Sequence, residues 1–500
     1  MQKKGRLELT WVGKYDEKKI EPRILLEDKS KSYGDPLSTN MLIHGDNLIA
    51  LEALMSEYEE RVKCVFIDPP YNTGNAFDKF DDGLEHSIWL DLMYRRLQYL
   101  HRLISEDGFI FVSLDEREHA YAKILLDEIF GRENFIGDII WQKRKGGGND
   151  SRFIALDHDY ILVFAKNIST QLHQDQWQTS QSEAYQKRYK EVDEKGDRYY
   201  WDTVARNGLQ NPIPVTVKCP DGSSLSINSQ LSQQTIENGL VSGMVRLSKS
   251  KNGWTLHRRV YMKGGQVQRS ILNDVGTNKD AADEMEYLFG DKKAFPYPKP
   301  ESLIARVLEL ATNEGDIVLD SFLGSGTTAA VAQKMNRRWI GIEIGNHAYS
   351  HCKPRMDRVI DGDDEGGITS LTGWKGGGGY HFYELAPSLL IKNEKLPIYQ
   401  INPEYSFDMI CEAICKIEGF KYKLNDVFHG YSSEKRFIHV TIEFVNAAYI
   451  KSLSAHLAEG QSLLIYGTKV QSDMVLPDNI EVKKIPKDLL EKCDFESEVR

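Results

Sequence analysis

The stretch "VLDSFLGSGTTAAVAQKMNRRWIGIEI" (residues 318–344) decides the fold, because it joins a strand, a glycine-containing turn, a helix and a second strand. The first strand ends at Asp320, and the second ends at Glu343, about 20 residues after the first glycine of the turn. This order predicts the first βαβ unit of a Rossmann-type sheet. In such a unit the glycines let a ligand approach the backbone closely, and the acid that ends the second strand binds ribose hydroxyls.

The turn also indicates which kind of ligand would bind there. It contains Gly324 and Gly326, but the third glycine of the dinucleotide motif is missing and Thr328 lies nearby instead. A dinucleotide needs its pyrophosphate held at the N-terminus of the helix, whereas an adenosyl cofactor without a phosphate does not. The sequence therefore favours S-adenosylmethionine over a nicotinamide cofactor.

Strands and helices alternate on both sides of a long central segment. This alternation predicts an α/β fold with a parallel sheet and helices on both faces. The central segment, residues 168–290, is rich in Gln, Ser, Asn and Gly and predicts an inserted β-rich domain. The remaining divisions that we expect are an N-terminal segment at 1–30, a catalytic half at 31–167, a cofactor-binding half at 291–385 and a small C-terminal α/β domain at 386–500.

A second informative stretch, "FIDPPYNTG" (residues 66–74), follows a short apolar run. Pro69 and Pro70 fix their own φ at about −65° and disfavour the α region for the residue before each of them. The stretch is therefore expected to form a rigid, extended corner that can hold a small planar group. Asp68 offers a carboxylate acceptor, the Pro69 carbonyl offers a second acceptor, and Tyr71 offers an aromatic face.

The proline corner and the glycine turn both follow strands, so they are expected at the same edge of the sheet. Ligands of open α/β sheets bind at the carboxyl ends of the strands. A methyl donor beside a planar amine predicts a methyltransferase. The exocyclic amine of adenine is a weak nucleophile, and two acceptors on its N–H groups would aim its lone pair at the methyl group. An adenine in a duplex must first be flipped out of the stack, and stacking on Tyr71 would offset part of that cost.

The distribution of charge points to a polyanionic partner in spite of the net charge of −11. Residues 241–269 contain basic side chains and no Asp or Glu, and Trp254, His257 and Tyr261 lie among them. Averages over a whole chain hide such local patches. The alternative for this segment is a solvated hairpin.

Compartment and metal content follow from simpler features. No apolar run approaches the roughly 18 residues of a membrane span, and the first residues lack the apolar region of a signal peptide. The six cysteines are scattered without a C-x-x-C motif, so neither a disulfide framework nor a metal site is expected. Cys411 and Cys415 would share a helix face as buried thiols. We therefore expect a cytoplasmic protein.

The motifs and their order resemble the amino-methylating DNA methyltransferases, in particular the β-class permutation. In that class a D-P-P-Y motif comes first, a target-recognition insert follows, and an F-x-G-x-G cofactor motif comes last, as here. The resemblance implies a circularly permuted, Rossmann-like, S-adenosylmethionine-dependent fold with a mixed, mainly parallel sheet, and it makes residues 168–290 the target-recognition domain. It gives the catalytic role to Asp68, Pro69, Pro70 and Tyr71. It gives cofactor binding to Asp46, Lys299, Pro300, Asp320, Phe322, Gly324, Ser325, Gly326, Thr327, Thr328 and Glu343.

The chain is also similar to the modification subunits of type III restriction systems in "LELTWVGK", "HDYILVFAKN", "NDVGTNKDAADEMEYLFG" and "IEVKKIPKDLLEKCDF". This resemblance implies double-stranded DNA as substrate, a homodimer and a helicase–nuclease restriction subunit as partner, with residues 386–500 serving dimerisation or partner binding. The chain is short for that group, so a solitary methyltransferase is the alternative. The DNA contacts that we expect come from Lys143, Arg144, Lys145, Lys249, Lys251, Arg258, Arg259 and Lys263.

Other activities fit the sequence less well. Similar cytosine-N4 enzymes favour a serine before the two prolines, so Asp68 favours adenine N6. A large basic and aromatic insert suits a reader of DNA bases better than an RNA methyltransferase. The missing third glycine argues against a nicotinamide oxidoreductase, and the complete D-P-P-Y motif argues against a DNA-binding module without catalysis.

Overall fold

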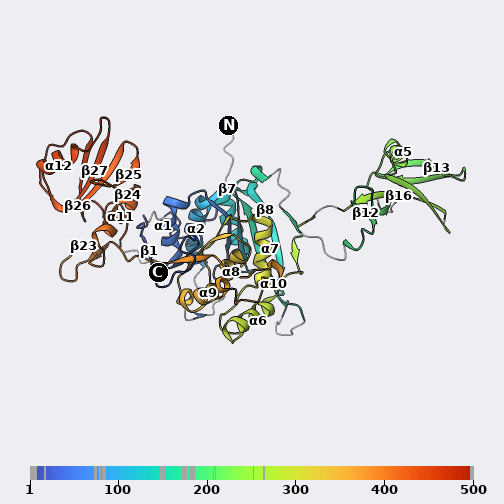
Figure 1. Cartoon of the computed structure of the whole chain (residues 1–500), viewed down its shortest axis with the longest axis horizontal. Coiled ribbons are helices and arrows are strands. Elements are labelled where there is room, and N and C mark those ends of the chain that lie inside the picture. The colour runs from blue at the N-terminus through green and yellow to red at the C-terminus, as the bar shows by residue number, and fades with distance from the viewer. Residues whose placement is uncertain are drawn as a thin grey trace. The chain divides into compact units, whose positions relative to one another are not determined.

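The chain forms two compact units in a computed structural model, one made of residues 1–176 with 269–500 and one of residues 177–268 (Figure 1). The structure describes residues 8–15, 19–71, 76–77, 80–81, 86–146, 153–171, 177–179, 186–205, 208, 210–251, 253–262 and 265–495.

An eleven-stranded sheet among these described residues organises the first unit. Its strands are β1 (Leu25–Glu27), β2 (Tyr33–Gly34), β3 (Met41–His44), β4 (Val62–Ile67), β7 (Ile104–Leu114), β8 (Phe135–Gln142), β9 (His158–Ala165), β18 (Ile271–Leu272), β19 (Ile317–Asp320), β20 (Arg338–Glu343) and β21 (Gly379–Leu385). The order β21–β3–β20–β19–β4–β7 is parallel, and β1, β2 and β9 pair with it in antiparallel fashion. The prediction of a mixed, mainly parallel sheet is confirmed. A separate short ribbon joins β5 (Ala76–Phe77) and β6 (Phe80–Asp81).

Helices cover both faces of this sheet. One group packs on a buried apolar cluster that includes Val65, Ile67 and Trp89: α1 (Asn47–Tyr58), α2 (His86–Leu103) and α3 (His119–Leu126). A second group, α7 (Glu301–Ala311), α8 (Thr327–Lys334) and α9 (Lys353–Asp361), packs from the other side, where α7 contacts β4 and α8 contacts β19 and β20. Side chains alternate between the two faces along each strand, so Phe66 points away from Val65 and Ile67. The short α10 (Thr369–Thr372) follows α9.

The two halves of the sequence meet at neighbouring strands. Leu319 of β19 lies opposite Val65 of β4 in a parallel pair, although a long stretch of chain separates them. The carboxyl ends of β4 and β19 are therefore adjacent. The residues that follow them, the proline corner and the glycine turn, start from the same edge of the sheet.

The second unit is an antiparallel sheet backed by a hairpin and a helix. Its elements are β10 (Gln178–Thr179), β11 (Glu191–Val192), β12 (Arg198–Thr203), β13 (Ile213–Lys218), β14 (Ser224–Ser229), α5 (Gln233–Ser242), β15 (Val245–Ser250), β16 (Gly253–Tyr261) and β17 (Gln266–Val267). The main sheet has the order β11–β12–β16–β15. Ser232 caps the start of α5, and Gly243 ends it with φ +74°.

This unit contains fewer residues, 177–268, than the insert predicted at 168–290. The strand β18 pairs with β8 of the main sheet, and α6 (Asn278–Phe289) begins where the Asn278 N–H bonds to the Lys143 carbonyl. Residues 269–290 therefore belong to the first unit. The predicted N-terminal segment, 1–30, also contributes β1 to the main sheet.

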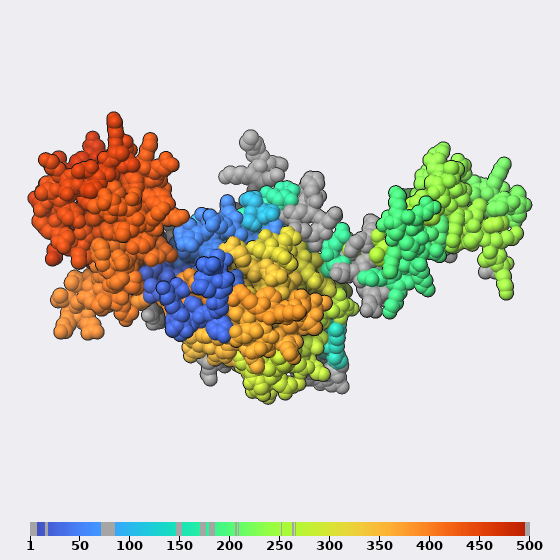
Figure 2. Space-filling view, in the orientation of Figure 1, coloured from blue at the N-terminus to red at the C-terminus, as the bar shows by residue number. Residues whose placement is uncertain are grey.

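The C-terminal residues build a second sheet of their own, in the order β24–β25–β26–β27–β28. β22 (Leu390–Lys392) and β23 (Tyr399–Ile401) form a separate two-stranded pair. The elements that follow are α11 (Phe407–Ile417), β24 (Lys421–Asn425), β25 (Phe428–Ser433), β26 (Arg436–Val445), α12 (Ala447–Ser454), β27 (Ser462–Val470) and β28 (Ile480–Lys484). They pack closely together (orange to red in Figure 2). Cys411 and Cys415 share the buried face of α11, as predicted. Among the described helices, none is both long and apolar enough to cross a membrane.

Candidate active site

A cavity of about 420 Å³ lies at the carboxyl ends of the central strands. Three acids that follow neighbouring strands line it: Asp68 after β4, Asp115 after β7 and Asp320 at the end of β19. The volume lies within the roughly 300–1,000 Å³ typical of small-molecule sites. The edge of the sheet therefore carries an acid-lined site.

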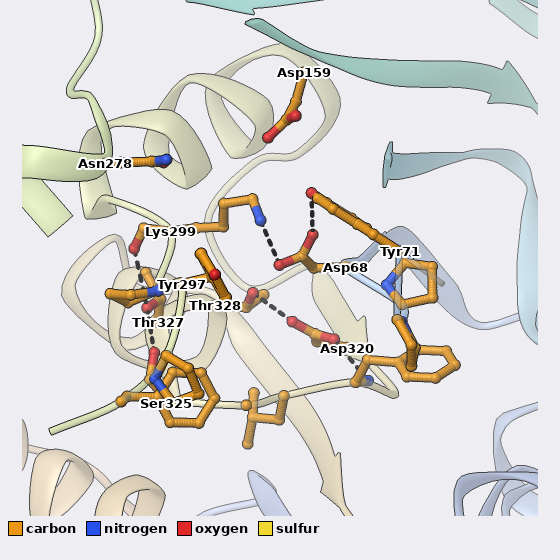
Figure 3. A pocket seen from close by; sticks show the side chains of 18 of the residues that line it. Asp68, Tyr71, Asp159, Asn278, Tyr297, Lys299, Asp320, Ser325, Thr327 and Thr328 are labelled. Atoms are coloured by element: carbon orange, nitrogen blue, oxygen red, sulfur yellow. Dashed lines mark hydrogen bonds and ion pairs between the residues drawn. The ribbon is translucent and has the colours of Figure 1, made fainter. Parts of the chain in front are cut away.

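Asp68 lies at the centre of a hydrogen-bonded cluster in this cavity. The Lys299 ammonium donates to Asp68 Oδ2 at 2.5 Å, and the Tyr71 hydroxyl donates to Oδ1 at 2.7 Å. Figure 3 shows these two side chains reaching the carboxylate from two sides. The Tyr71 hydroxyl also lies 2.9 Å from Ser113 Oγ at the end of β7, and the Lys299 ammonium lies 5.1 Å from the centre of the Tyr71 ring. Both carboxylate oxygens of Asp68 are thus engaged.

A hydrogen bond from α2 holds the proline corner in place. Trp89 is fully buried, and its indole N–H donates to the Pro70 carbonyl at 2.7 Å. An indole N–H that is buried almost always finds such a partner. The Pro70 carbonyl is therefore already satisfied, and the corner has a fixed position relative to α2.

The glycine turn is shaped by backbone conformations that favour glycine. Gly324 has φ +57° and Gly326 has φ +82°, and a Cβ on Gly326 would lie 3.2 Å from the Cα of Cys352. The buried Arg355 holds the turn in place, because its Nη1 donates to Thr327 Oγ1 at 2.8 Å and to the Ser325 carbonyl at 3.3 Å. The turn is therefore both tight and rigid.

Two buried carboxyl groups flank this turn, and burial raises the pKa of both. Burial raises the pKa of Asp320 to about 7, although Thr328 Oγ1 and the Phe322 N–H donate to its carboxyl at 2.6 and 2.9 Å. Burial also raises the pKa of Glu343 to about 7, against hydrogen bonds from the N–H groups of Gly345 and Gly324, each at 2.8 Å. Both groups change charge near neutral pH.

The structure brings most of the predicted catalytic and cofactor residues into this one cavity. Those that line it are Asp68, Pro69, Pro70, Tyr71, Lys299, Asp320, Phe322, Gly324, Ser325, Thr327 and Thr328. Those that do not are Asp46, Pro300, Gly326 and Glu343. The Asp46 carboxylate caps α1 through the N–H of Leu48 at 2.8 Å and pairs with Arg96 at 3.1 Å. Pro300 is the residue that precedes α7.

Several residues that line the cavity were not singled out from the sequence. They are Phe66, Asp115, Arg117, Asp159, Asn278, Phe295, Pro296, Tyr297, Pro298, Ile304, Leu323 and His347. Ser113 was not singled out either, and it contacts the site through the Tyr71 hydroxyl. Asp159 had a usable signal, because an acid inside the apolar run "HDYILVFA" needs a partner. That partner is Lys143, whose ammonium lies 2.6 Å from Asp159 Oδ1.

The predicted DNA-binding residues fall into two places. Lys143 and Arg144 line the cavity, and Lys145 is exposed beside them. In the second unit, Lys249 pairs with Asp221 at 2.8 Å, Lys251 is exposed, and Lys263 lies outside the described residues. Arg258 and Arg259 are neighbours on β16 and therefore point to opposite faces of its sheet.

A comparison with protein families identifies the class to which this fold and site belong. The family model described as DNA methylase matches residues 62–353, which is more than half of the chain and includes both motifs. The chain belongs to this DNA methylase family. In the parts of the chain that the structure describes, no group of His, Cys, Asp and Glu is arranged to hold a metal ion.

Individual relatives include restriction–modification proteins. The chain is 32% identical to the probable type III restriction-modification enzyme HindVI Mod subunit of Haemophilus influenzae, over 80% of this chain and 60% of that protein. It is 31% identical to the StyLTI Mod subunit of Salmonella typhimurium, over 63% and 52%. It is 29% identical to the type II methyltransferase M.KpnI of Klebsiella pneumoniae, over 62% and 80%. The chain thus spans a little over half the length of the two Mod subunits.

Proposed function

We propose that this protein transfers a methyl group from S-adenosylmethionine to the N6 amine of an adenine in duplex DNA. The observation that carries the proposal is the meeting of two motifs in one cavity: the Asp68 carboxylate on its proline corner and the rigid turn around Gly324. A DNA methylase needs an acceptor for the target amine and a pocket for the methyl donor, side by side.

The residues present fit S-adenosylmethionine. The glycine turn exposes its backbone to the cavity, Asp320 is buried beside it, and Phe295, Tyr297 and Phe322 supply apolar walls. These groups would hold the cofactor, with Thr327 and Thr328 at the start of α8. When bound, the cofactor supplies an electrophilic methyl group carried on a sulfonium. The chain's own contribution is to hold that group in line with the target amine.

The proline corner would hold the target base. Asp68 accepts one N–H of the amine, and the Pro69 carbonyl is the candidate for the other, since Trp89 already occupies the Pro70 carbonyl. The Tyr71 ring offers a stacking face. The Lys299 ammonium occupies both places, on Asp68 Oδ2 and over the Tyr71 ring, so it must move aside when a base enters.

We infer further that the chain is the modification and recognition subunit of a type III-like system, in which residues 386–500 serve dimerisation or partner binding. The similarity to two Mod subunits supports this role. The second candidate is a solitary methyltransferase, and the higher share of the M.KpnI sequence that the chain covers favours it. In either role the reaction takes place in the cytoplasm, and the unit of residues 177–268 reads the DNA.

Single-molecule sequencing of DNA from cells that express this chain tests the activity. We expect N6-methyladenine at one short motif, on one strand only if the type III-like role holds. N4-methylcytosine at the motif would show that the substrate is cytosine and not adenine. Unmodified DNA both in these cells and after incubation of the pure protein with S-adenosylmethionine would contradict the proposal.

Cofactor binding is expected to depend on pH. The pKa of Asp320 and of Glu343 is raised to about 7 by burial, so both carboxyls are mainly protonated at pH 6 and ionised at pH 8. Ionisation favours a cationic sulfonium, so affinity should rise with pH, by up to about tenfold per pH unit for each carboxyl that must ionise. Calorimetric titration with S-adenosylmethionine measures this. Asp320→Asn should flatten the dependence, and an affinity that falls from pH 6 to 8 would contradict the assignment.

A further inference from the structure

The four-stranded sheet of the second unit has two faces of different chemistry. Successive side chains of a strand point to opposite faces. In the β12–β16 pairing Trp201 lies opposite Arg259 and Asp202 lies opposite Arg258, so the first pair shares one face and the second pair shares the other. The β15–β16 pairing places Arg246 opposite His257, on the face of Arg259.

One of these faces is the core of the unit. Val245, Leu256 and Val204 lie on it in an apolar cluster with Ile236 of α5 and Val215 of β13. The helix α5 packs on β15 and β13. Arg258 belongs to this face and lies 3.6 Å from Asp202. The packed face therefore has its own covering and its own partner for Arg258.

The other face carries arginines stacked on aromatic rings, and we call it the arginine–aromatic face. Its members are Tyr199, Trp201, Arg246, Arg259 and Tyr261. The Arg246 guanidinium lies 4.1 Å from the Trp201 ring centre, and the Arg259 guanidinium lies 4.3 Å from that of Tyr199 and 5.4 Å from that of Trp201. Trp201 thus contacts two guanidinium groups.

Hydrogen-bonding groups on this face lack partners inside the protein. Within the described part of the chain, the exposed Arg246 side chain has no hydrogen-bond or ion-pair partner. His257 Nδ1 and Arg259 Nε are buried without a partner there as well. Arg259 Nη1 does donate to the Tyr261 hydroxyl at 3.1 Å, which in turn donates to Asp193 at 2.9 Å. Stacking fixes the guanidinium planes. The N–H edge of the exposed Arg246 stays available, and on Arg259, whose Nε is buried, the Nη groups are the donors that DNA could reach.

We propose that the arginine–aromatic face is the DNA-contacting surface of this unit and that Arg246 and Arg259 read guanines through it. The inference rests on the proposed DNA methyltransferase function and deepens it by naming the surface. The major groove admits a two-stranded β-ribbon, and an arginine bonds bidentately to guanine O6 and N7. The hairpin β15–β16 lies at the edge of the sheet and carries both arginines. The surrounding residues 241–269 include seven basic and no acidic side chains, which complements a polyanion.

Two neighbouring arginines provide a matched comparison. Full-length wild-type protein would first select preferred sequences from short DNA duplexes with a randomised centre. Fluorescence anisotropy at one fixed salt concentration would then compare Arg259→Ala, Arg246→Ala and Arg246→Lys with Arg258→Ala. Far-ultraviolet circular dichroism and thermal melting would confirm that each variant is folded.

Arg246→Ala and Arg259→Ala should each weaken binding to the selected duplexes by roughly 10- to 100-fold, the range for loss of a bidentate base contact. Arg246→Lys keeps the positive charge but loses the planar guanidinium with its paired N–H donors. It should therefore relax the preference for guanine at one position. Arg258→Ala should weaken binding by about threefold or less, because Arg258 lies on the packed face and pairs there with Asp202. A loss at Arg258 that equals or exceeds the loss at Arg259 would overturn the assignment of the face.

Two further outcomes separate this inference from the proposed function. If the wild-type protein methylates DNA while the Arg246 and Arg259 variants keep their affinity and sequence preference, only the surface is wrong. If the wild-type protein prefers single-stranded RNA of equal length, or binds and methylates no duplex, the DNA methyltransferase proposal falls and the inference falls with it.

Discussion

The Asp68→Ala variant is expected to lose methyl transfer by about 100- to 1,000-fold or more, the range for removing one aimed hydrogen-bonding group from a reacting centre. Asp68 lies at the carboxyl end of β4, and its carboxylate is the acceptor that we assign to the target amine. Without it the amine keeps its lone pair in the ring. Single-turnover assays with labelled S-adenosylmethionine on DNA that contains the methylated motif measure this loss.

A second variant separates charge from hydrogen bonding. Asp68→Asn keeps one side-chain oxygen, so it should retain more activity than Asp68→Ala. Both variants should bind S-adenosylmethionine within a few-fold of wild type, because the Asp68 carboxylate bonds to Lys299 and Tyr71 and not to the glycine turn. An alanine variant that keeps turnover, or that loses cofactor binding to the same extent as activity, would refute the role of Asp68.

The periodic and short-range features of this fold could be read from the sequence. The buried run of β4 and the β19–α8–β20 unit have strong apolar patterns, and each forms where it was predicted. Two prolines fix the corner at Pro69, and two glycines fix the turn at Gly326, through local backbone sterics. Residues of this kind determine their conformation without distant neighbours.

Contacts between distant segments could not be read in the same way. The resemblance assigns Lys299 to cofactor binding, and only the fold shows that its ammonium reaches Asp68, in the other half of the chain. The acid Asp46 serves as the cap of α1. Arg258 and Arg259 are alike in sequence, and only the strand register assigns them to opposite faces. Such details depend on pairing partners that a single sequence does not reveal.

The strand β1 near the N-terminus and the strand β18 after the insert could not be predicted from the sequence either. A two-residue strand such as β18 has too few residues for a periodic pattern, and its pairing with β8 moves residues 269–290 into the first unit. Likewise β1 joins the main sheet through pairs such as Leu25 with Leu385. The composition of the chain changes across the predicted insert, but composition does not locate the residue at which the main sheet resumes.

Glu301→Gln is expected to destabilise the first unit by about 3–5 kcal/mol, the cost of removing one charge from a buried ion-pair network. The Glu301 carboxylate lies 2.8 Å from the Lys334 ammonium and 2.9 Å from Arg355 Nη2, and the side chains of both cations are fully buried. It also accepts the Ile368 N–H at 3.0 Å. Urea unfolding followed by tryptophan fluorescence measures the change as a shift of the transition in which the first unit unfolds.

An exposed ion pair of the same length serves as the control. Glu59 and Arg102 lie 2.8 Å apart with about half of each side chain exposed, so Glu59→Gln should cost about 1 kcal/mol or less. The buried pair should also matter for function, because Arg355 holds the Ser325 carbonyl and the Thr327 hydroxyl of the glycine turn. Glu301→Gln should therefore weaken S-adenosylmethionine binding even at temperatures where it is folded, whereas Glu59→Gln should not. Equal losses of stability in the two variants would show that burial does not determine the cost of breaking these pairs. Unchanged cofactor binding in Glu301→Gln would show that the glycine turn keeps its shape without the ion pair between Glu301 and Arg355.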